Sequence, residues 1–91
     1  MKFEWDTGKA ETNFRKHNVA FTEAATVFAD KLGVTIYDPD HSKDGVRYIT
    51  IGHSRKGKVL MVAHTDRGDR IRIISARELT KAERGAYEED K

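Results

Sequence analysis

Three short segments between residues 47 and 76, joined by glycine-containing turns, constrain the fold of this chain most strongly. Segments 47–53 and 70–76 alternate isoleucine with polar, aromatic or charged residues, whereas segment 59–65 is apolar on both faces. Alternation with a period of two is typical of β-strands, and a strand that is apolar on both faces is usually central. Together with the β-branched and aromatic run at 34–37, these segments predict a four-stranded antiparallel meander.

A strand at 2–6 and a helix are predicted at the start of the chain. Phe3 and Trp5 alternate with charged residues in that strand. Asp6 is expected to cap a helix from Thr7 to about His17, because its carboxylate can accept hydrogen bonds from free amide groups of the first turn. Asn18 is a suitable helix stop, since asparagine tolerates a left-handed backbone.

Two further helices flank the meander in the sequence. Thr22 is expected to cap a helix that ends at Gly33. Thr80 and Glu83 have the spacing of a capping box, which predicts a last helix from Thr80 to about Glu89. The predicted fold class is therefore α+β, with a strand, two helices, the four-stranded meander and a C-terminal helix.

Length and composition limit the organisation and the setting. Ninety-one residues are enough for one domain and too few for two, so residues 1–91 are expected to form a single domain, with its clearest loop at 38–45. There is no cysteine, which excludes disulfides and a thiolate metal site. No secretory signal and no apolar run of roughly 20 residues is present, which predicts a soluble, cytoplasmic protein without membrane contact.

Charge is distributed unevenly along the chain. Residues 1–54 hold seven lysines and arginines against eight acids, whereas residues 55–84 hold nine against four. Four arginines of the second region are concentrated in a short stretch, namely Arg67, Arg70, Arg72 and Arg77. Guanidinium groups pair bidentately with phosphate oxygens, so this cluster favours a phosphate-binding surface. The alternative is a solvated strand face.

The residue types that remain for chemistry are histidine, arginine, lysine, glutamate and tyrosine. No zinc motif, nucleophile elbow or phosphate-binding glycine loop is present, so no metal ion and no other cofactor is expected. Such a set suits RNA cleavage through the 2′-hydroxyl, in which a base takes the hydroxyl proton, a cation stabilises the phosphorus oxygens and an acid protonates the departing 5′-oxygen.

Two blocks of residues resemble the BrnT family of ribonuclease toxins. They comprise Phe3, Trp5, Asp6, Lys9, Asn13, Lys16, His17, Val19 and Phe21 near the N-terminus, and 72–77, Thr80, Glu83, Arg84 and Tyr87 near the C-terminus. Asn18 departs from the glycine that the family usually has there, which matters little because asparagine also accepts a positive φ angle.

The resemblance implies a RelE-like fold, with a curved sheet, helices on one face and an RNA-binding concavity on the other. It implies a toxin of a type II toxin–antitoxin system that cleaves RNA and arrests growth. The implied partner is a ribbon-helix-helix antitoxin, in a complex of two toxins and two antitoxins, and contact with DNA is expected only through that antitoxin.

Nine residues are candidates for the site. The catalytic candidates are His64, Arg72 and Arg77, and the RNA-binding candidates are Lys16, His17, Arg47, Arg70, Arg84 and Tyr87. The alternatives are structural: Arg77 pairs with a nearby glutamate, and His64 is a buried, hydrogen-bonded histidine. Two other functions also remain open, namely a toxin of this fold that acts on another target, such as gyrase, and a nucleic-acid-binding module without catalysis.

Overall fold

The computed structural model describes residues 1–41 and 45–89, so residues 42–44 of the predicted loop lie outside the described residues. The elements are β1 (Lys2–Glu4), α1 (Thr7–His17), α2 (Phe21–Thr26), the 3₁₀ turn η1 (Val27–Ala29), β2 (Val34–Tyr37), the 3₁₀ turn η2 (Pro39–His41), β3 (Tyr48–His53), β4 (Val59–Arg67), β5 (Arg70–Glu78) and α3 (Lys81–Glu89). This order confirms the predicted α+β class and the predicted succession of strands and helices. None of the described helices is long and apolar enough to cross a membrane.

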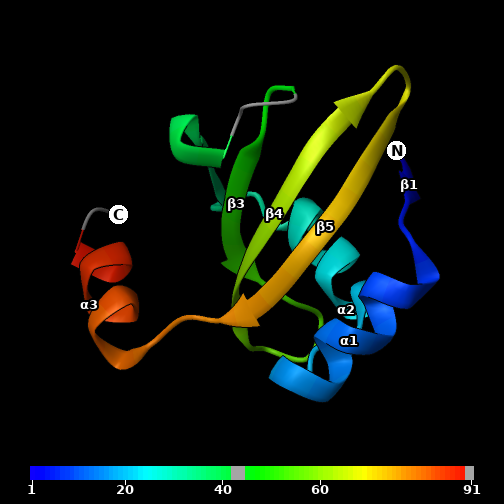
Figure 1. Cartoon of the computed structure of the whole chain (residues 1–91). Coiled ribbons are helices and arrows are strands. Elements are labelled where there is room, and N and C mark those ends of the chain that lie inside the picture. Colours follow the sequence, from blue (N-terminus) through cyan, green and yellow to red (C-terminus); the bar gives the residue numbers. More distant parts are fainter. Residues whose placement is uncertain (42–44, 90–91) are drawn as a thin grey trace.

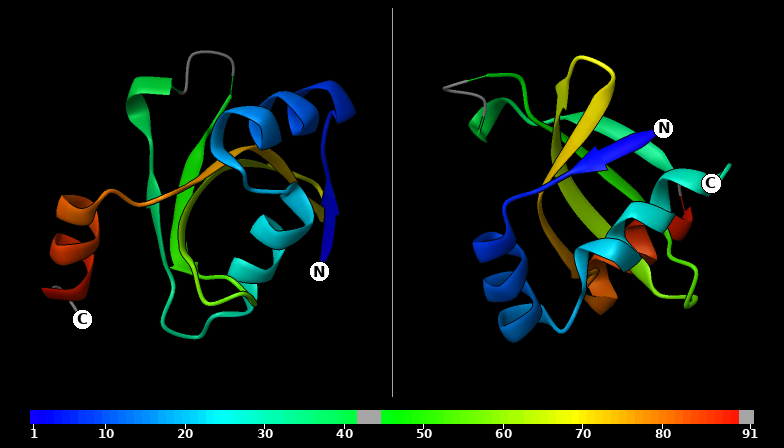
Figure 2. Two further views of the ribbon diagram at one scale, coloured as in Figure 1. Left: turned by 90° about the horizontal axis from the view of Figure 1, so that it is seen from below. Right: turned by 90° about the vertical axis from the view of Figure 1, so that its right-hand side faces the viewer.

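The five strands form one sheet in the order β1-β5-β4-β3-β2 (Figure 1). The neighbours from β2 to β5 pair antiparallel, which confirms the four-stranded meander. β1 pairs in parallel with the first residues of β5 and brings Glu4 opposite Arg72. Figure 2 shows α1 and α2 on the side of the sheet away from α3. The chain's first residues therefore lie beside its arginine-rich strand.

Helix α1 agrees with the sequence prediction at both ends. The Asp6 side chain caps it by accepting a hydrogen bond from the Lys9 amide at 3.0 Å. This hydrogen bond lowers the pKa of Asp6 below its ordinary value. Asn18 ends the helix with a left-handed backbone at φ 56°, and its amide donates to the Phe14 carbonyl.

Helix α2 differs from the prediction. It begins at Phe21 and has Ala20 at its cap position, so Thr22 lies inside the helix and makes no cap. The α-helix ends at Thr26 and continues only as η1, so Gly33 lies in the turn before β2. Phe21 is 2% exposed. Burial of that ring contributes about 1.5–3 kcal/mol, which outweighs the roughly 1 kcal/mol of a threonine cap.

The apolar core lies between the sheet and the helices α1 and α2. The buried cluster consists of Val19, Phe21, Ala24, Val27, Leu60, Val62, Ile73 and Ala76. Phe3, Trp5 and Phe28 pack against this cluster. Phe14 lies outside the core and is 51% exposed on α1.

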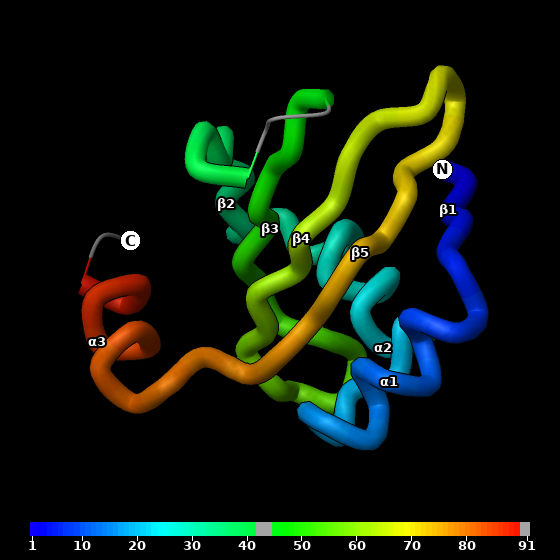
Figure 3. The backbone as a smooth tube through the Cα atoms, viewed as in Figure 1, coloured from blue at the N-terminus to red at the C-terminus, as the bar shows by residue number. Residues whose placement is uncertain are grey.

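The C-terminal helix α3 stands apart from α1 and α2 at the opposite side of the sheet (Figure 3). Its predicted capping box is confirmed, because the Thr80 amide donates to Glu83 Oε1 at 2.8 Å and the Glu83 amide donates to Thr80 Oγ1 at 3.2 Å. Ala82 and Ala86 are exposed. The buried residue of α3 is Tyr87, whose hydroxyl donates to the Leu32 carbonyl at 3.2 Å.

One buried amide side chain joins α1 to the sheet. Asn13 is 6% exposed, and its Nδ2 donates to the carbonyls of Val19 and Ala76 at 3.0 and 2.9 Å. Its Oδ1 accepts from the Ala76 amide at 3.0 Å. The Asn13 side chain therefore supplies hydrogen-bond partners for the backbone of β5 at its outer edge, beyond the short span that β1 covers.

We predict that Asn13→Ala lowers the free energy of unfolding by about 2–4 kcal/mol, because it leaves buried backbone groups of Val19 and Ala76 without a hydrogen bond. Urea denaturation followed by circular dichroism measures this loss. Thr12→Ala, at an exposed position of the same helix, is the control and should change stability by no more than about 0.5 kcal/mol. Equal stability of the two variants would contradict the role given to Asn13.

Candidate functional site

The face of the sheet opposite the core carries a polar cleft between α1 and the residues that follow β2. Two adjoining hollows form it, and they share His41 and Arg47. The first is lined by Lys9, Asp40, His41, Gly45, Val46, Arg47, Thr65, Arg67, Arg72 and Ile74. The second is lined by Lys16, His17, Asp38, His41, Arg47, Ile49, Met61, Ala63, Ser75, Ala76 and Arg77. We call these two hollows together the cationic cleft.

Positive charge dominates the lining of the cationic cleft. Its lysines and arginines are Lys9, Lys16, Arg47, Arg67, Arg72 and Arg77. Its acids are Asp38 and Asp40. A concave surface lined by one sign of charge focuses the field and raises the local concentration of an oppositely charged ligand. The arginines that the sequence groups in one stretch thus contribute to a surface suited to a polyanion.

An extra residue in β5 brings Arg72 and Arg77 to the same face of the sheet. The two arginines are five residues apart, and an odd spacing places side chains on opposite faces of a regular strand. In the ladder, His64 pairs with Ile73 and Ala63 pairs with Ser75, which leaves Ile74 without an opposite residue. This irregularity shifts the alternation by one position. Both arginines therefore border the cationic cleft.

Arg72 is held at the wall of the cleft by β1. Its Nη1 donates to Glu4 Oε2 at 2.8 Å, and the Arg72 side chain is 30% exposed. This contact follows from the parallel register in which Glu4 lies opposite Arg72. Among the described residues, the contact uses one of the five N–H groups of Arg72. The remaining donors are available to a phosphate.

Arg77 is held by α3, as the structural alternative predicted. Its Nη1 and Nη2 donate to the two carboxylate oxygens of Glu83 at 2.8 and 3.0 Å, and Nη1 also donates to the Glu78 carbonyl at 3.1 Å. The pair raises the pKa of Arg77, and it lowers the pKa of Glu83 to about 2. These three bonds leave the Nε–H and one Nη2–H of Arg77, which form the second edge of the guanidinium fork. Arg77 therefore both anchors α3 and borders the cleft.

His64 lies away from the two arginines, on the core face of the sheet. It is 4% exposed, and its Nε2 lies 2.7 Å from Thr50 Oγ1. Its ring contacts Phe28 edge-on and stacks on Tyr48, with centroids 4.9 and 5.9 Å apart. Burial lowers the pKa of His64. The catalytic role predicted for His64 assumed access to RNA, which this burial removes, so the placement favours a structural role.

The RNA-binding candidates divide into two groups. Lys16, His17 and Arg47 border the cationic cleft, the first two from the end of α1. Arg70, Arg84 and Tyr87 border neither hollow. Arg70 Nη1 lies 3.9 Å from Glu4 Oε1, Arg84 pairs with Glu88 at 3.0 Å, and Tyr87 is the buried residue of α3.

Lys9 and His41 border the cleft although sequence reasoning assigned neither to a site, and Arg67 borders it as a member of the predicted arginine cluster. Lys9 lies two turns before His17 on α1, a spacing that places both on one side of a helix. His41 lies in η2, within a segment predicted only as loop. Local patterns carry no signal for His41, because its position depends on how the segment packs beside β3.

Residues 1–41 and 45–89 contain no group of three or more histidine or acidic side chains arranged to hold a metal ion.

Comparison with known proteins agrees with this geometry. The sequence profile of the family described as "Ribonuclease toxin, BrnT, of type II toxin-antitoxin system" matches residues 5–83. The chain belongs to this family. The 1.1 Å crystal structure of the Brucella abortus ribonuclease toxin BrnT has a TM-score of 0.66 and 24% sequence identity, and the match covers 89% of this chain and 99% of that one. At this identity the structural likeness concerns the fold. A search of curated proteins found no match.

The family resemblance inferred from the two sequence blocks is therefore confirmed, and the cationic cleft is the feature of this BrnT-family chain that most suits an RNA substrate. The antitoxin partner follows from the same family description, since type II toxins are neutralised by a protein.

We predict that Glu83→Gln reduces the protection of α3 amides against hydrogen exchange at pH 7, by up to about fivefold for a half-exposed ion pair. The pKa of Glu83 falls from 4.5 to about 2. Its stabilisation is thus fully present above pH 4.5 and is lost as the pH falls toward about 2. The difference between variant and wild type should shrink across that window. Glu89→Gln, at an exposed position of α3, is the control at pH 7 for loss of one charge, and a difference that stays constant with pH would contradict this origin.

Proposed function

We propose that this chain is a metal-independent endoribonuclease that binds RNA in the cationic cleft and cleaves it through the 2′-hydroxyl. The observation that carries the proposal is the convergence of Arg72, Arg77 and His17 on one concave face. The family description supports ribonuclease activity in general terms. The 2′-hydroxyl route needs no metal ion to generate a nucleophile, because the substrate supplies its own.

The residues of the cleft match the needs of that route. Attack of the 2′-oxygen puts negative charge on the phosphoryl oxygens, and the free donors of Arg72 and Arg77 are suited to stabilise it. Lys9 and Lys16 attract the polyanion. His17 lies at the C-terminus of α1 and borders the second hollow of the cleft. It is suited to protonate the departing 5′-oxygen, which leaves a 2′,3′-cyclic phosphate and a 5′-hydroxyl.

The antitoxin is proposed to be a ribbon-helix-helix protein that assembles with the toxin as two copies of each. The support for a protein partner is the type II family. Uncontrolled cleavage of RNA in the cytoplasm would arrest growth, which explains why such a chain requires a neutralising partner. An acidic or cleft-covering surface of the antitoxin suits the charge of the cationic cleft.

We predict that the purified wild-type chain cleaves RNA in EDTA and that an Arg72→Ala, Arg77→Ala double variant loses about 10²–10³-fold in rate, because it lacks the phosphate donors. The readout is the rate of appearance of fragments with cyclic phosphate ends. An Arg55→Ala, Arg84→Ala double variant removes the same charge outside the cleft and should retain activity. Circular dichroism checks that each variant is folded.

The other outcomes separate the alternatives. Intact RNA with the wild type would reject cleavage of free RNA, and altered DNA supercoiling in that case would indicate a gyrase-type target. Cleavage that disappears only when EDTA is present would reject metal independence. RNA binding without cleavage would indicate a non-catalytic binding module.

A further inference from the structure

Asp38 and His41 form a hydrogen-bonded pair on the side of the cationic cleft opposite α1. His41 Nδ1 lies 2.9 Å from Asp38 Oδ2. An ionised carboxylate has no proton to donate, so the ring donates its Nδ1–H to Asp38. The neutral imidazole then carries a lone pair on Nε2. The pair therefore fixes the tautomer that can accept a proton.

The burial of the two partners differs in a way that suits proton transfer. The Asp38 side chain is 13% exposed, whereas the His41 side chain is 65% exposed. His41 borders both hollows of the cleft, and His17 borders the second from the other side. A shielded carboxylate that orients an accessible imidazole also stabilises the imidazolium that forms when the ring takes a proton.

We propose that His41 is the general base of the RNA cleavage reaction and that Asp38 is its positioning residue, an assignment that rests on the proposed function. His41 Nε2 takes the proton of the 2′-hydroxyl as the 2′-oxygen bonds to phosphorus. The bond from phosphorus to the 5′-oxygen breaks, and that oxygen takes a proton from His17. The products are a 2′,3′-cyclic phosphate and a 5′-hydroxyl, with one proton gained by His41 and one lost by His17.

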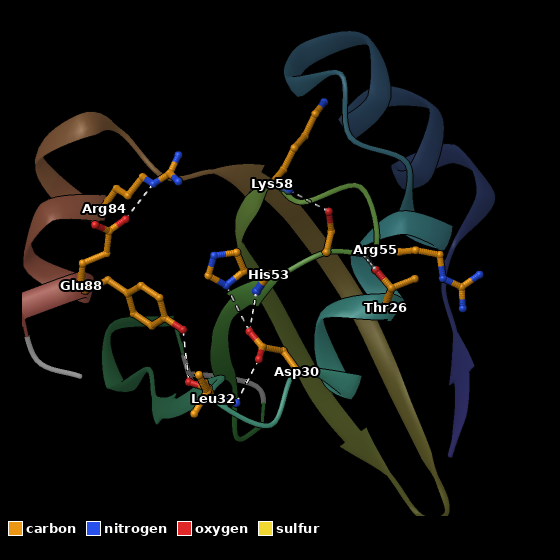
Figure 4. Close-up of polar contacts among 10 residues, drawn as sticks. Thr26, Asp30, Leu32, His53, Arg55, Lys58, Arg84 and Glu88 are labelled. Carbon is orange, nitrogen blue, oxygen red and sulfur yellow. Dashed lines mark hydrogen bonds and ion pairs between the residues drawn. The ribbon is translucent and has the colours of Figure 1, made fainter.

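The chain contains a second aspartate–histidine pair that serves as a matched control. His53 Nδ1 lies 3.4 Å from Asp30 Oδ2, with side-chain exposures of 46% and 15% (Figure 4). Asp30 also accepts from the backbone amides of His53 and Leu32 at 2.8 and 3.0 Å, which lower its pKa. Neither Asp30 nor His53 borders the cationic cleft. The second pair thus has similar chemistry and exposure in a place away from the substrate.

The test compares His41→Gln with His53→Gln on an RNA oligonucleotide in EDTA. His41→Gln should lower kcat at least about 100-fold, and His53→Gln should stay within about twofold of wild type. Binding of a 2′-O-methyl RNA, which lacks the nucleophile, should change by less than about threefold in both variants. Asp38→Asn should lower kcat by about tenfold or more with little change in KM, because it disturbs the tautomer of His41 without removing a phosphate contact.

A substrate with sulfur in place of the departing 5′-oxygen separates the base from the acid. A thiolate leaves without protonation, so this substrate should restore the rate of His17→Gln and leave His41→Gln slow. Restoration of His41→Gln would overturn its role as base and make it the acid. Cleavage by His41→Gln at the rate of His53→Gln would overturn the role of His41 and leave the proposed ribonuclease intact. Failure of the wild type to cleave RNA would overturn both.

Discussion

The antiparallel pairing of β4 with β5 places both the core and the cleft. On one face it brings Leu60 and Val62 together with Ile73 and Ala76, and all four are at most 1% exposed. On the other face it carries the floor of the cationic cleft. A slip of the register by one residue would exchange the two faces and bury arginines, so the apolar cluster holds the register firmly. The packing of the core therefore determines where the arginines of β5 lie in the cleft.

The unpaired residue in β5 modifies this pairing at one place and has consequences on both faces. Before Ile74 the inward residues of β5 are Ile71 and Ile73, and after it the inward residue is Ala76. Asn13 accepts from the amide of Ala76 and donates to its carbonyl, immediately after the irregularity. That double contact fixes β5 where its alternation changes. It also fixes α1, which supplies Lys16 and His17 to the cleft.

Local sequence signals predicted the parts of the fold that local chemistry determines. The Asp6 cap, the Asn18 stop and the capping box of Thr80 and Glu83 each depend on groups within four residues, and each is present. Thr22 shows the limit of such signals, because burial of Phe21 outweighed a favourable cap. The parallel pairing of β1 with β5 joins segments almost seventy residues apart, which no local pattern encodes.

The sequence predicted several residues of the candidate site, but it did not predict how those residues are arranged in space. The arginine cluster and the end of α1 were recognised, because charge and a helix terminus can be seen in the sequence. The separation of His64 from Arg72 depends on the faces of β4 and β5, since His64 pairs with Ile73 and Thr65 pairs with Arg72. His41 was missed because it lies in η2, where only tertiary packing positions it.

The cations of the cleft fall into two physical classes. Arg72 and Arg77 are held by Glu4 and Glu83 from outside the cleft lining, and each keeps donors that no described residue uses. Each glutamate neutralises part of the attraction between its arginine and a phosphate. It also orders the guanidinium, which then loses less conformational entropy when it binds a phosphate, and this offsets part of the lost attraction. Lys9 and Lys16 form no ion pair within residues 1–41 and 45–89. Under the proposed function, the lysines attract the RNA, whereas the oriented arginines hold the scissile phosphate in place.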